Sequence, residues 1–587
     1  MNENPNDHQK RLVLVIILSM GMLFGWQLLA THMGWITVPE PAADAGVAQV
    51  DAGAVAEAPG AETPSPAPSE APAAVADAPA RSESFETPTQ QLTFSSRGGG
   101  LSAAVLRSGE RWKPYKFERR ENKAEPGVQH VDMVRVLPSQ PLPGATEITG
   151  ELRLSPSTNY AMERFEDGVR LVAQSETVRV EKRYWLSPAG YELRLQQTIT
   201  NVSGREGKAS LSIGWPAYID PKTEETGSFF SPPPELSQVI CRHASDTEMV
   251  QYDKDGKKET FPGPVRFVGF DERYFLGAVF PRFTEGTSCL LEVDPVGTRS
   301  GTLLVDLGTL KPGESVTRDF GIYLGPKALE MLNAVSEANL QGAPLTQLAT
   351  GAGVAPAGMP AAEKVDPELS NAIDFGWWAV VASLLLRIMK MFQQVVVNWG
   401  IAIILLTVLV KALLYPLTKK SMESMEAMKK LQPHMEALRK KYENDREKLN
   451  MEMMRLYQEH KVNPFGGCLP MLIQMPVWIA LYRTLLSSFE LYREPLLPFW
   501  ITDLTAADPF YILPLAMGAT MFITQKMQPQ MGDPNQAKIM LYFMPVFFTF
   551  IMLNLPAGLT LYIFTNNLLS IAQQKYLQHR MAQKAKA

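Results

Sequence analysis

One lysine lies inside an apolar run, where its positive charge is the group most able to attract or bind a partner. Residues 398–417 read NWGIAIILLTVLVKALLYPL, which is long enough for a membrane-spanning helix of about 20 residues. Lys411 within such a helix costs roughly 3 kcal/mol on insertion scales, so charges of this kind usually face protein or water and serve function. Thr407 lies one helical step earlier on the same face. The pair therefore predicts a helix face turned toward protein or water.

The depth of this lysine leaves one alternative open. Lys411 follows Asn398 by 13 residues, which places it about 20 Å into a hydrocarbon core of roughly 30 Å. That position is past the midplane and nearer the end marked by Lys419 and Lys420. A lysine there could instead snorkel, with its stem along lipid and its ammonium among the headgroups.

Further polar side chains lie within the apolar segments that follow. With the first run extended to about 396–417, we expect spans at about 468–488, 510–527, 539–553 and 559–574, the last two joined by the tight hairpin NLPAG. Within them lie Gln474, Asn567, Ser570 and Gln574. Any one such residue is more often a hydrogen-bonding contact between helices than a functional group. Together with Thr407 and Lys411 they could line a hydrated groove open to the cytoplasm.

The segment 419–462 predicts a helical hairpin with a methionine-rich surface. Met422, Met425 and Met428 recur at three-residue spacing, Met435 follows, and Met453 lies on the second helix. Two antiparallel helices joined by a short turn would give this pattern. The methionines could form the seam between the helices, or they could give an adaptable surface for varied apolar ligands.

The rest of the chain divides by composition. Lys10 and Arg11 precede the apolar run 12–30, which favours a retained anchor with a cytoplasmic N-terminus over a cleaved signal peptide. We expect a cytoplasmic stub and anchor at 1–38, a Pro/Ala-rich disordered tether at 39–84, a β domain at 85–341, a linker at 342–366, an amphipathic helix on the outer membrane surface at 367–394, a membrane core at 395–580 and a cytoplasmic tail at 581–587.

Alternation of polar and apolar residues predicts an all-β sandwich for the middle region. Residues 178–186 and 191–196 alternate and are joined by the turn SPAG, as in a β-hairpin. Tyr191, Leu193 and Leu195 should share one face. Cys241 and Cys289 could form a disulfide if this region is extracytoplasmic, but two buried free thiols are the expected state.

Basic residues set the expected orientation. Residues 418–463 carry 11 Lys and Arg, whereas residues 489–510 carry only Arg493. The positive-inside rule then places the first loop and the basic C-terminal tail in the cytoplasm, and the β domain outside. With the anchor, six spans and two cytoplasmic termini are self-consistent.

The sequence excludes several function classes. A net charge of −5 gives no nucleic-acid signal. Residues 308–315 read GTLKPGES, but Glu314 stands where a phosphate-binding loop needs lysine. Three cysteines make no metal cluster, and no hydrolase or nucleotide motif is found. We therefore expect no enzyme, no cofactor, no metal and no DNA partner.

Four stretches of the sequence resemble the YidC/Oxa family of membrane-protein insertases, in its Gram-negative long form. They are NWGIAIILLTVLVKALLYPLT (398–418), KVNPFGGCLPMLIQMP (461–476), DPFYILPLAMGATMFITQKM (508–527) and NLPAGLTLYIFTNNLLSIAQQ (554–574). The resemblance is strong over about 368–580. It implies a groove closed to the outside, and it implies a β domain similar to a galactose-mutarotase-like super-sandwich.

The resemblance also implies function and partners. A client span would land on the hairpin methionines and slide past the lipid-facing residues Met540, Phe543, Met544 and Phe547. The partners would be nascent membrane proteins, the Sec translocon, ribosome–nascent chain complexes and the phospholipid bilayer of the inner membrane. The family most often has arginine where this chain has Lys411, which argues that charge rather than a bidentate fork is needed. A folding chaperone without translocating activity is the alternative, and a solute transporter carries little weight because no inverted repeat is found.

Overall fold

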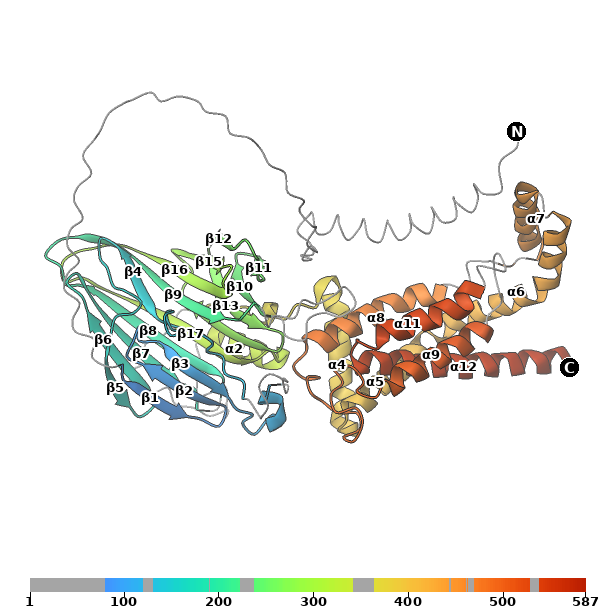
Figure 1. Cartoon of the computed structure of the whole chain (residues 1–587), viewed down its shortest axis with the longest axis horizontal. Coiled ribbons are helices and arrows are strands. Elements are labelled where there is room, and N and C mark those ends of the chain that lie inside the picture. The colour runs from blue at the N-terminus through green and yellow to red at the C-terminus, as the bar shows by residue number, and fades with distance from the viewer. Residues whose placement is uncertain are drawn as a thin grey trace, which may run out of the picture. The chain divides into compact units, whose positions relative to one another are not determined.

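A computed structural model describes residues 80–119, 130–188, 190–221, 237–341, 364–442, 445–460, 462, 469–527 and 538–586 (Figure 1). The predicted anchor, most of the tether and most of the linker lie outside these ranges. The described part divides into a β region and a helical region, each built from segments whose patterns differ as the sequence predicts.

Three antiparallel sheets make up the β region (Figure 1). The first is β1 (Ser82–Glu86), β2 (Gln90–Ser95) and β3 (Leu101–Leu106), so the β region begins three residues before the expected start. The nine-stranded sheet has the order β11 (Asp246–Val250), β10 (Ser237–His243), β13 (Val265–Glu272), β14 (Phe275–Pro281), β17 (Ser315–Pro326), β8 (Glu192–Asn201), β7 (Val178–Leu186), β6 (Gly168–Gln174) and β5 (Ala161–Phe165). The five-stranded sheet has the order β12 (Lys257–Pro262), β15 (Thr287–Val293), β16 (Thr298–Leu310), β9 (Gly207–Tyr218) and β4 (Thr146–Gly150).

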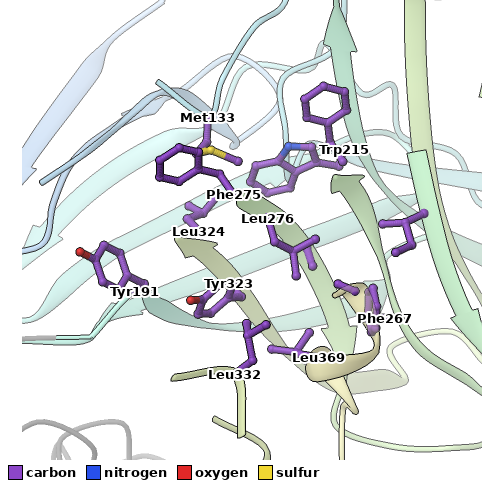
Figure 2. Packing of buried hydrophobic residues seen from close by; sticks show 14 of the residues in the cluster. Met133, Tyr191, Trp215, Phe267, Phe275, Leu276, Tyr323, Leu324, Leu332 and Leu369 are labelled. Atoms are coloured by element: carbon purple, nitrogen blue, oxygen red, sulfur yellow. The ribbon is translucent and has the colours of Figure 1, made fainter. Parts of the chain in front are cut away.

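The two larger sheets pack face to face around one apolar core, which confirms the predicted all-β sandwich. Trp215 of β9 lies over β14 in that core, beside Phe275 and Leu276 (Figure 2). The close approach depends on Gly277, because a Cβ there would lie 2.9 Å from the indole ring. Helix α2 (Leu329–Gln341) and a 3₁₀ turn at Leu369–Ala372 add Leu332 and Leu369 to the same core (Figure 2).

The predicted hairpin is confirmed, with one difference. Strands β7 and β8 pair antiparallel with Leu186 opposite Leu193, and Tyr191, Leu193 and Leu195 are buried. Glu192 and Arg194, which alternation places outward, are buried as well. Strand β8 lies between β17 and β7 inside the nine-stranded sheet. A polar residue buried there needs a partner, and Arg194 pairs with Asp319 at 3.1 Å.

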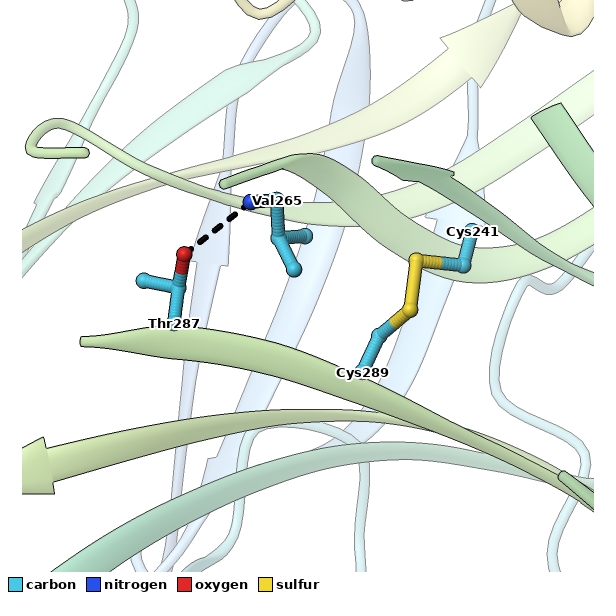
Figure 3. The surroundings of a disulfide bond; sticks show 4 residues. All are labelled: Cys241, Val265, Thr287 and Cys289. Atoms are coloured by element: carbon cyan, nitrogen blue, oxygen red, sulfur yellow. Dashed lines mark hydrogen bonds between the residues drawn. A yellow bond between two sulfur atoms is a disulfide. The ribbon is translucent and has the colours of Figure 1, made fainter. Parts of the chain in front are cut away.

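The expectation of two free thiols was wrong. Cys241 on β10 and Cys289 on β15 form a disulfide that joins the two large sheets (Figure 3). The side chain of Thr287 links the same region by accepting a hydrogen bond from the Val265 amide at 3.0 Å (Figure 3). The two cysteines are 48 residues apart, and sequence spacing alone cannot show which strands face each other across a sandwich.

The helical region begins later than the sequence pattern suggests. Residues 369–378 form two 3₁₀ turns, at Leu369–Ala372 and Gly376–Trp378, and the helix α4 runs from Ala379 to Val396. Gly376 has a positive φ of 63°, which an α-helix does not allow. The predicted single helix over 367–394 is therefore interrupted at its start.

The helices after α4 follow the predicted order (Figure 1). They are α5 (Trp399–Leu413), α6 (Tyr415–Lys441), α7 (Arg446–Glu459), α8 (Leu469–Ser487), α9 (Ile512–Met527), the π-helical turn η5 (Ile539–Phe543), α11 (Met544–Met552) and α12 (Ala557–Lys586). The β region also contains the short 3₁₀ helix η1 (Pro114–Phe117). By length and composition, α4 could cross a membrane, and α5 with α6 could form a second span although they meet at a 67° bend. The six-span arrangement stays a prediction.

Helix α4 has a buried side and an exposed apolar side. Ala382, Leu385, Leu386 and Met389 are buried, whereas Val380 and Val395 are largely exposed. Of the two charged residues in this helix, Arg387 is exposed on the side of Val380 and Lys390 is half-buried. The surface position predicted for this helix remains untested.

Removing the disulfide should lower the free energy of unfolding of the β domain by about 4 kcal/mol, because a 48-residue loop would be released in the unfolded chain. The measurement is the urea midpoint of tryptophan fluorescence for Cys241→Ser/Cys289→Ser in the full chain. Cys468→Ser is the matched control. Equal midpoints for the double variant and the control would contradict the expectation.

Burial raises the pKa of Glu192 to about 7, so the folded β domain favours the protonated carboxyl. The unfolded value is 4.5, so this contribution to stability is complete below that pH and is lost as pH rises toward 7. Glu192→Gln should therefore be about 3 kcal/mol more stable than the parent at pH 8, and nearly equal to it at pH 4.5.

Chemical denaturation at the two pH values tests this expectation. Titration of Glu181 does not interfere. Hydrogen bonds from Arg170, and to a smaller extent from Arg183, lower the pKa of that carboxyl to about 2, which is below both pH values of the measurement. A difference between variant and parent that is the same at both pH values would show that Glu192 does not titrate as expected.

Candidate functional site

Helix α5 carries Lys411 in its last turn. Asn398 caps the start of the helix by accepting a hydrogen bond from the Ile401 amide at 3.0 Å. Leu414 ends it, and Pro416 lies in the first turn of α6, where its missing N–H costs least. The bend follows directly after the lysine, and a cation near a helix C-terminus is favourable.

The amine of Lys411 is held by a hydroxyl on another helix. Its Nζ donates a hydrogen bond to Ser570 Oγ of α12 at 2.8 Å. Ser570 Oγ in turn donates to the carbonyl oxygen of Asn566 at 2.8 Å. The ammonium of Lys411 is therefore stabilised by the dipole of a hydroxyl group whose orientation is fixed by its own hydrogen bond.

Helix α8 joins the same arrangement through an amide. Gln474 Nε2 donates to Asn566 Oδ1 at 2.6 Å and to Tyr562 Oη at 2.8 Å. Lys411, Ser570, Asn566, Gln474 and Tyr562 thus form one polar cluster contributed by α5, α8 and α12. Hydrogen-bonding groups among apolar helices need such partners.

Three of the six predicted groove residues lie elsewhere. Asn567 Nδ2 faces Thr520 Oγ1 of α9 at 3.5 Å, and Gln574 Nε2 donates to the Met527 carbonyl at 3.0 Å. Thr407 is fully buried, and its hydroxyl donates to the Ile403 carbonyl of its own helix at 2.7 Å. The structure therefore brings together Lys411, Ser570 and Gln474, and directs the other three toward α9 or their own backbone.

Sequence reasoning missed two members of the polar cluster. Asn566 lies four residues before Ser570 and Tyr562 four before Asn566, so helical spacing from Ser570 could have found both. The same face of α12 continues to Gln573, whose Nε2 donates to Thr418 Oγ1 of α6 at 2.8 Å. Polar contacts thus run along α12 from the cluster to the base of the hairpin.

Lys411 is paired with no carboxylate among the residues that the structure describes. Its one polar partner there is the Ser570 hydroxyl. Hydroxyl and amide groups orient a cation without cancelling its charge. The polar cluster therefore keeps a net positive charge.

Helices α6 and α7 form the predicted hairpin, and three of its methionines lie in the seam. Met428 and Met435 are buried with Leu431, and Met453 packs against them. Met422 and Met425 are half-buried. Two methionines that the sequence reasoning did not single out, Met451 and Met454, are exposed.

The predicted lipid-facing residues lie on η5 and α11. Met540, Phe543 and Phe547 are exposed, and Met544 is half-buried. The rings of Phe543 and Phe547 stack with centroids 5.5 Å apart. An exposed apolar strip of this kind is unfavourable in water and suits a lipid or protein neighbour.

The chain thus combines a β sandwich with apolar helices that surround a lysine without a described carboxylate partner, which is compatible with a membrane protein. The family model "60Kd inner membrane protein" matches residues 391–584, and the "YidC periplasmic domain" model matches residues 84–388. The chain therefore belongs to the YidC family of membrane protein insertases.

Two relatives, at 43% and 39% identity, agree with this assignment. A membrane protein insertase YidC from Anaeromyxobacter sp. strain Fw109-5 is 43% identical, with 84% of this chain and 83% of that protein covered. The protein of that name from Anaeromyxobacter dehalogenans strain 2CP-C is 39% identical, with 98% of each covered. A crystal structure of an active YidC insertase with its first transmembrane domain resolved is 19% identical, covers 84% of this chain and 91% of its own, and has a TM-score of 0.36.

The burial of Met428 predicts that it stabilises the hairpin. Met428→Ala should raise hydrogen exchange in α6 and α7 by an amount equivalent to about 2 kcal/mol, because a buried side chain leaves a cavity. The exposed Met451→Ala should change exchange by less than about 0.5 kcal/mol. Equal effects of the two substitutions would show that Met428 is not a seam residue.

Proposed function

We propose that this insertase moves short polar tails of client proteins through a hydrophilic groove that is open to the cytoplasm and to lipid. The polar cluster forms the charged part of this groove. The observation that carries the proposal is the amine of Lys411, which lies among apolar helices with a hydroxyl partner at 2.8 Å and no described carboxylate.

The uncancelled charge gives the groove its selectivity. An acidic residue in a client tail would meet Lys411 and accept a hydrogen bond from an N–H group that Ser570 does not use. Lysine has three donors, so it can bind a carboxylate while it still contacts Ser570. A carboxylate tail moving outward is also driven by the membrane potential, by roughly 2.3 kcal/mol per charge per 100 mV.

The hairpin and the strip on η5 and α11 would receive the apolar part of the client. The exposed Met451 and Met454 offer flexible side chains, and the half-buried Met422 and Met425 could join them if the hairpin opens. Met540, Phe543, Met544 and Phe547 would then guide the client span into lipid. Transfer of the apolar span into the bilayer supplies the remaining free energy.

The proposal includes the orientation and partners predicted above. In this proposal the chain has six membrane spans, both termini in the cytoplasm and the β domain in the periplasm of a Gram-negative cell. The protein acts alone or with the Sec translocon, and it receives clients from ribosome–nascent chain complexes. It performs no catalysed covalent step and uses no cofactor.

Changing the charge at position 411 tests the mechanism. Lys411→Glu should reduce insertion of clients with acidic tails by at least tenfold, because an attraction worth about 1.5–3 kcal/mol becomes a repulsion. Lys411→Arg should retain insertion because it keeps the charge. The measurement is insertion of acidic-tailed and neutral-tailed clients in cells depleted of the native protein.

The result for Lys411→Glu, together with photo-crosslinking, distinguishes an insertase from a folding chaperone. If Lys411→Glu inserts acidic-tailed clients at the parent rate, the charge has no role in translocation. Photo-crosslinks to clients at Phe543 and Phe547 but none at Ser570 or Gln474 would then favour a folding chaperone whose clients stay in lipid.

A further inference from the structure

The β region and the helical region contact each other through the buried side chain of Lys116. Both belong to one compact unit, Val75–Ala587. Lys116 lies on η1 of the β region, and the segment 488–494 directly follows α8. The side chain of Lys116 is 1% exposed, which is rare for a lysine unless its charge is paired.

All three donors of the Lys116 amine are used by the segment after α8. Its Nζ lies 3.2 Å from the Phe489 carbonyl oxygen, 2.9 Å from that of Glu490 and 3.0 Å from Glu494 Oε1. An ammonium has three N–H groups, so its capacity is filled. The two carbonyls also lie just beyond the C-terminus of α8, where a cation is favoured.

An aromatic side chain fixes the same contact from the other direction. The Phe489 ring is fully buried and lies 5.0–5.6 Å from the rings of Trp112, Phe117 and Phe275 of the β region. Tyr492 stacks on Tyr274 of the β region with centroids 4.1 Å apart. These contacts combine apolar burial with defined ring geometry.

Helix α4 joins this contact through Glu490, the residue next to Phe489. Glu490 is buried, and its carboxylate lies 2.7 Å from Lys390 Nζ of α4. Lys390 also approaches Glu330 of α2 at 3.8 Å. On the other side, Arg493 donates to the Glu118 carbonyl at 2.7 Å. The segment after α8 is thus tied to the β region, and Lys390 links α4 to that segment.

We propose that the β domain is docked on the membrane core by Lys116 and Phe489, and that its role is to brace the segment 488–494 after α8 and, through the Lys390–Glu490 pair, helix α4. The proposal does not depend on the groove mechanism, because none of these residues belongs to the polar cluster. Breaking one partner of a buried ion pair is far more damaging than losing an exposed pair, so Lys116 carries the contact and its neighbour Lys113 does not.

Lys113 provides the matched control. It pairs with the same Glu494 carboxylate at 3.6 Å, but its side chain is 58% exposed. In the full chain in nanodiscs, Lys116→Met should raise amide hydrogen exchange of the segment 488–494 at least tenfold. Lys113→Met should change it by less than about threefold, as expected for an exposed pair. Strands β7 and β8 report whether the β domain stays folded.

A second variant keeps the test decisive if Lys116→Met unfolds the β domain. Glu494→Gln alters the contact from the side of the core and should raise exchange of residues 111–119. Exchange of 488–494 that is unchanged in Lys116→Met with β7 and β8 protected would overturn the proposal. Exchange of 111–119 that is unchanged in Glu494→Gln would overturn it as well.

Discussion

A positive charge enclosed by apolar helices must be solvated by the protein or by water, and the arrangement of α5, α8 and α12 answers that requirement. Lys411 donates a hydrogen bond to the Ser570 hydroxyl, and that hydroxyl donates to the Asn566 backbone carbonyl. The Asn566 side chain accepts a hydrogen bond from Gln474. Hydroxyls and amides orient the ammonium while leaving its charge uncancelled. A carboxylate in their place would stabilise the bundle but abolish the attraction for acidic clients on which the proposed mechanism depends.

The surroundings of Lys116 and Lys411 neutralise the two charges to different extents, and Lys116 is buried whereas Lys411 is half-buried. Lys116 in the β domain has an acid, two carbonyls and aromatic rings around it, and burial lowers its pKa although Glu494 opposes the shift. Every donor is used inside the chain, which suits a structural contact. Lys411 has one described partner, a neutral hydroxyl. The difference in neutralisation distinguishes the proposed docking residue from the proposed client-binding residue.

In this chain, sequence periodicity and hydropathy predict well which segments form strands and helices. They predict poorly which side of each helix faces its neighbours. The sandwich, the β7–β8 hairpin and the α6–α7 hairpin follow from periodicity. Periodicity did not show that Asn566, rather than Asn567, belongs to the polar cluster. Adjacent residues lie about 100° apart on a helix, so only packing decides which of the two faces the cluster. Thr407 is fully buried and its hydroxyl donates to the Ile403 carbonyl of its own helix, a contact that sequence spacing does not reveal. The Cys241–Cys289 disulfide depends on the stacking of two sheets, which leaves no trace in the spacing of cysteines.

The most direct test of the central claim is the accessibility of position 411 to water. Lys411→Cys, combined with Cys468→Ser so that the remaining cysteines are the bonded pair Cys241 and Cys289, would be treated with a membrane-impermeant thiol reagent from each side of the membrane. A hydrated groove open to the cytoplasm predicts labelling from the cytoplasmic side and none from outside. Labelling from neither side, or from outside alone, would contradict the account.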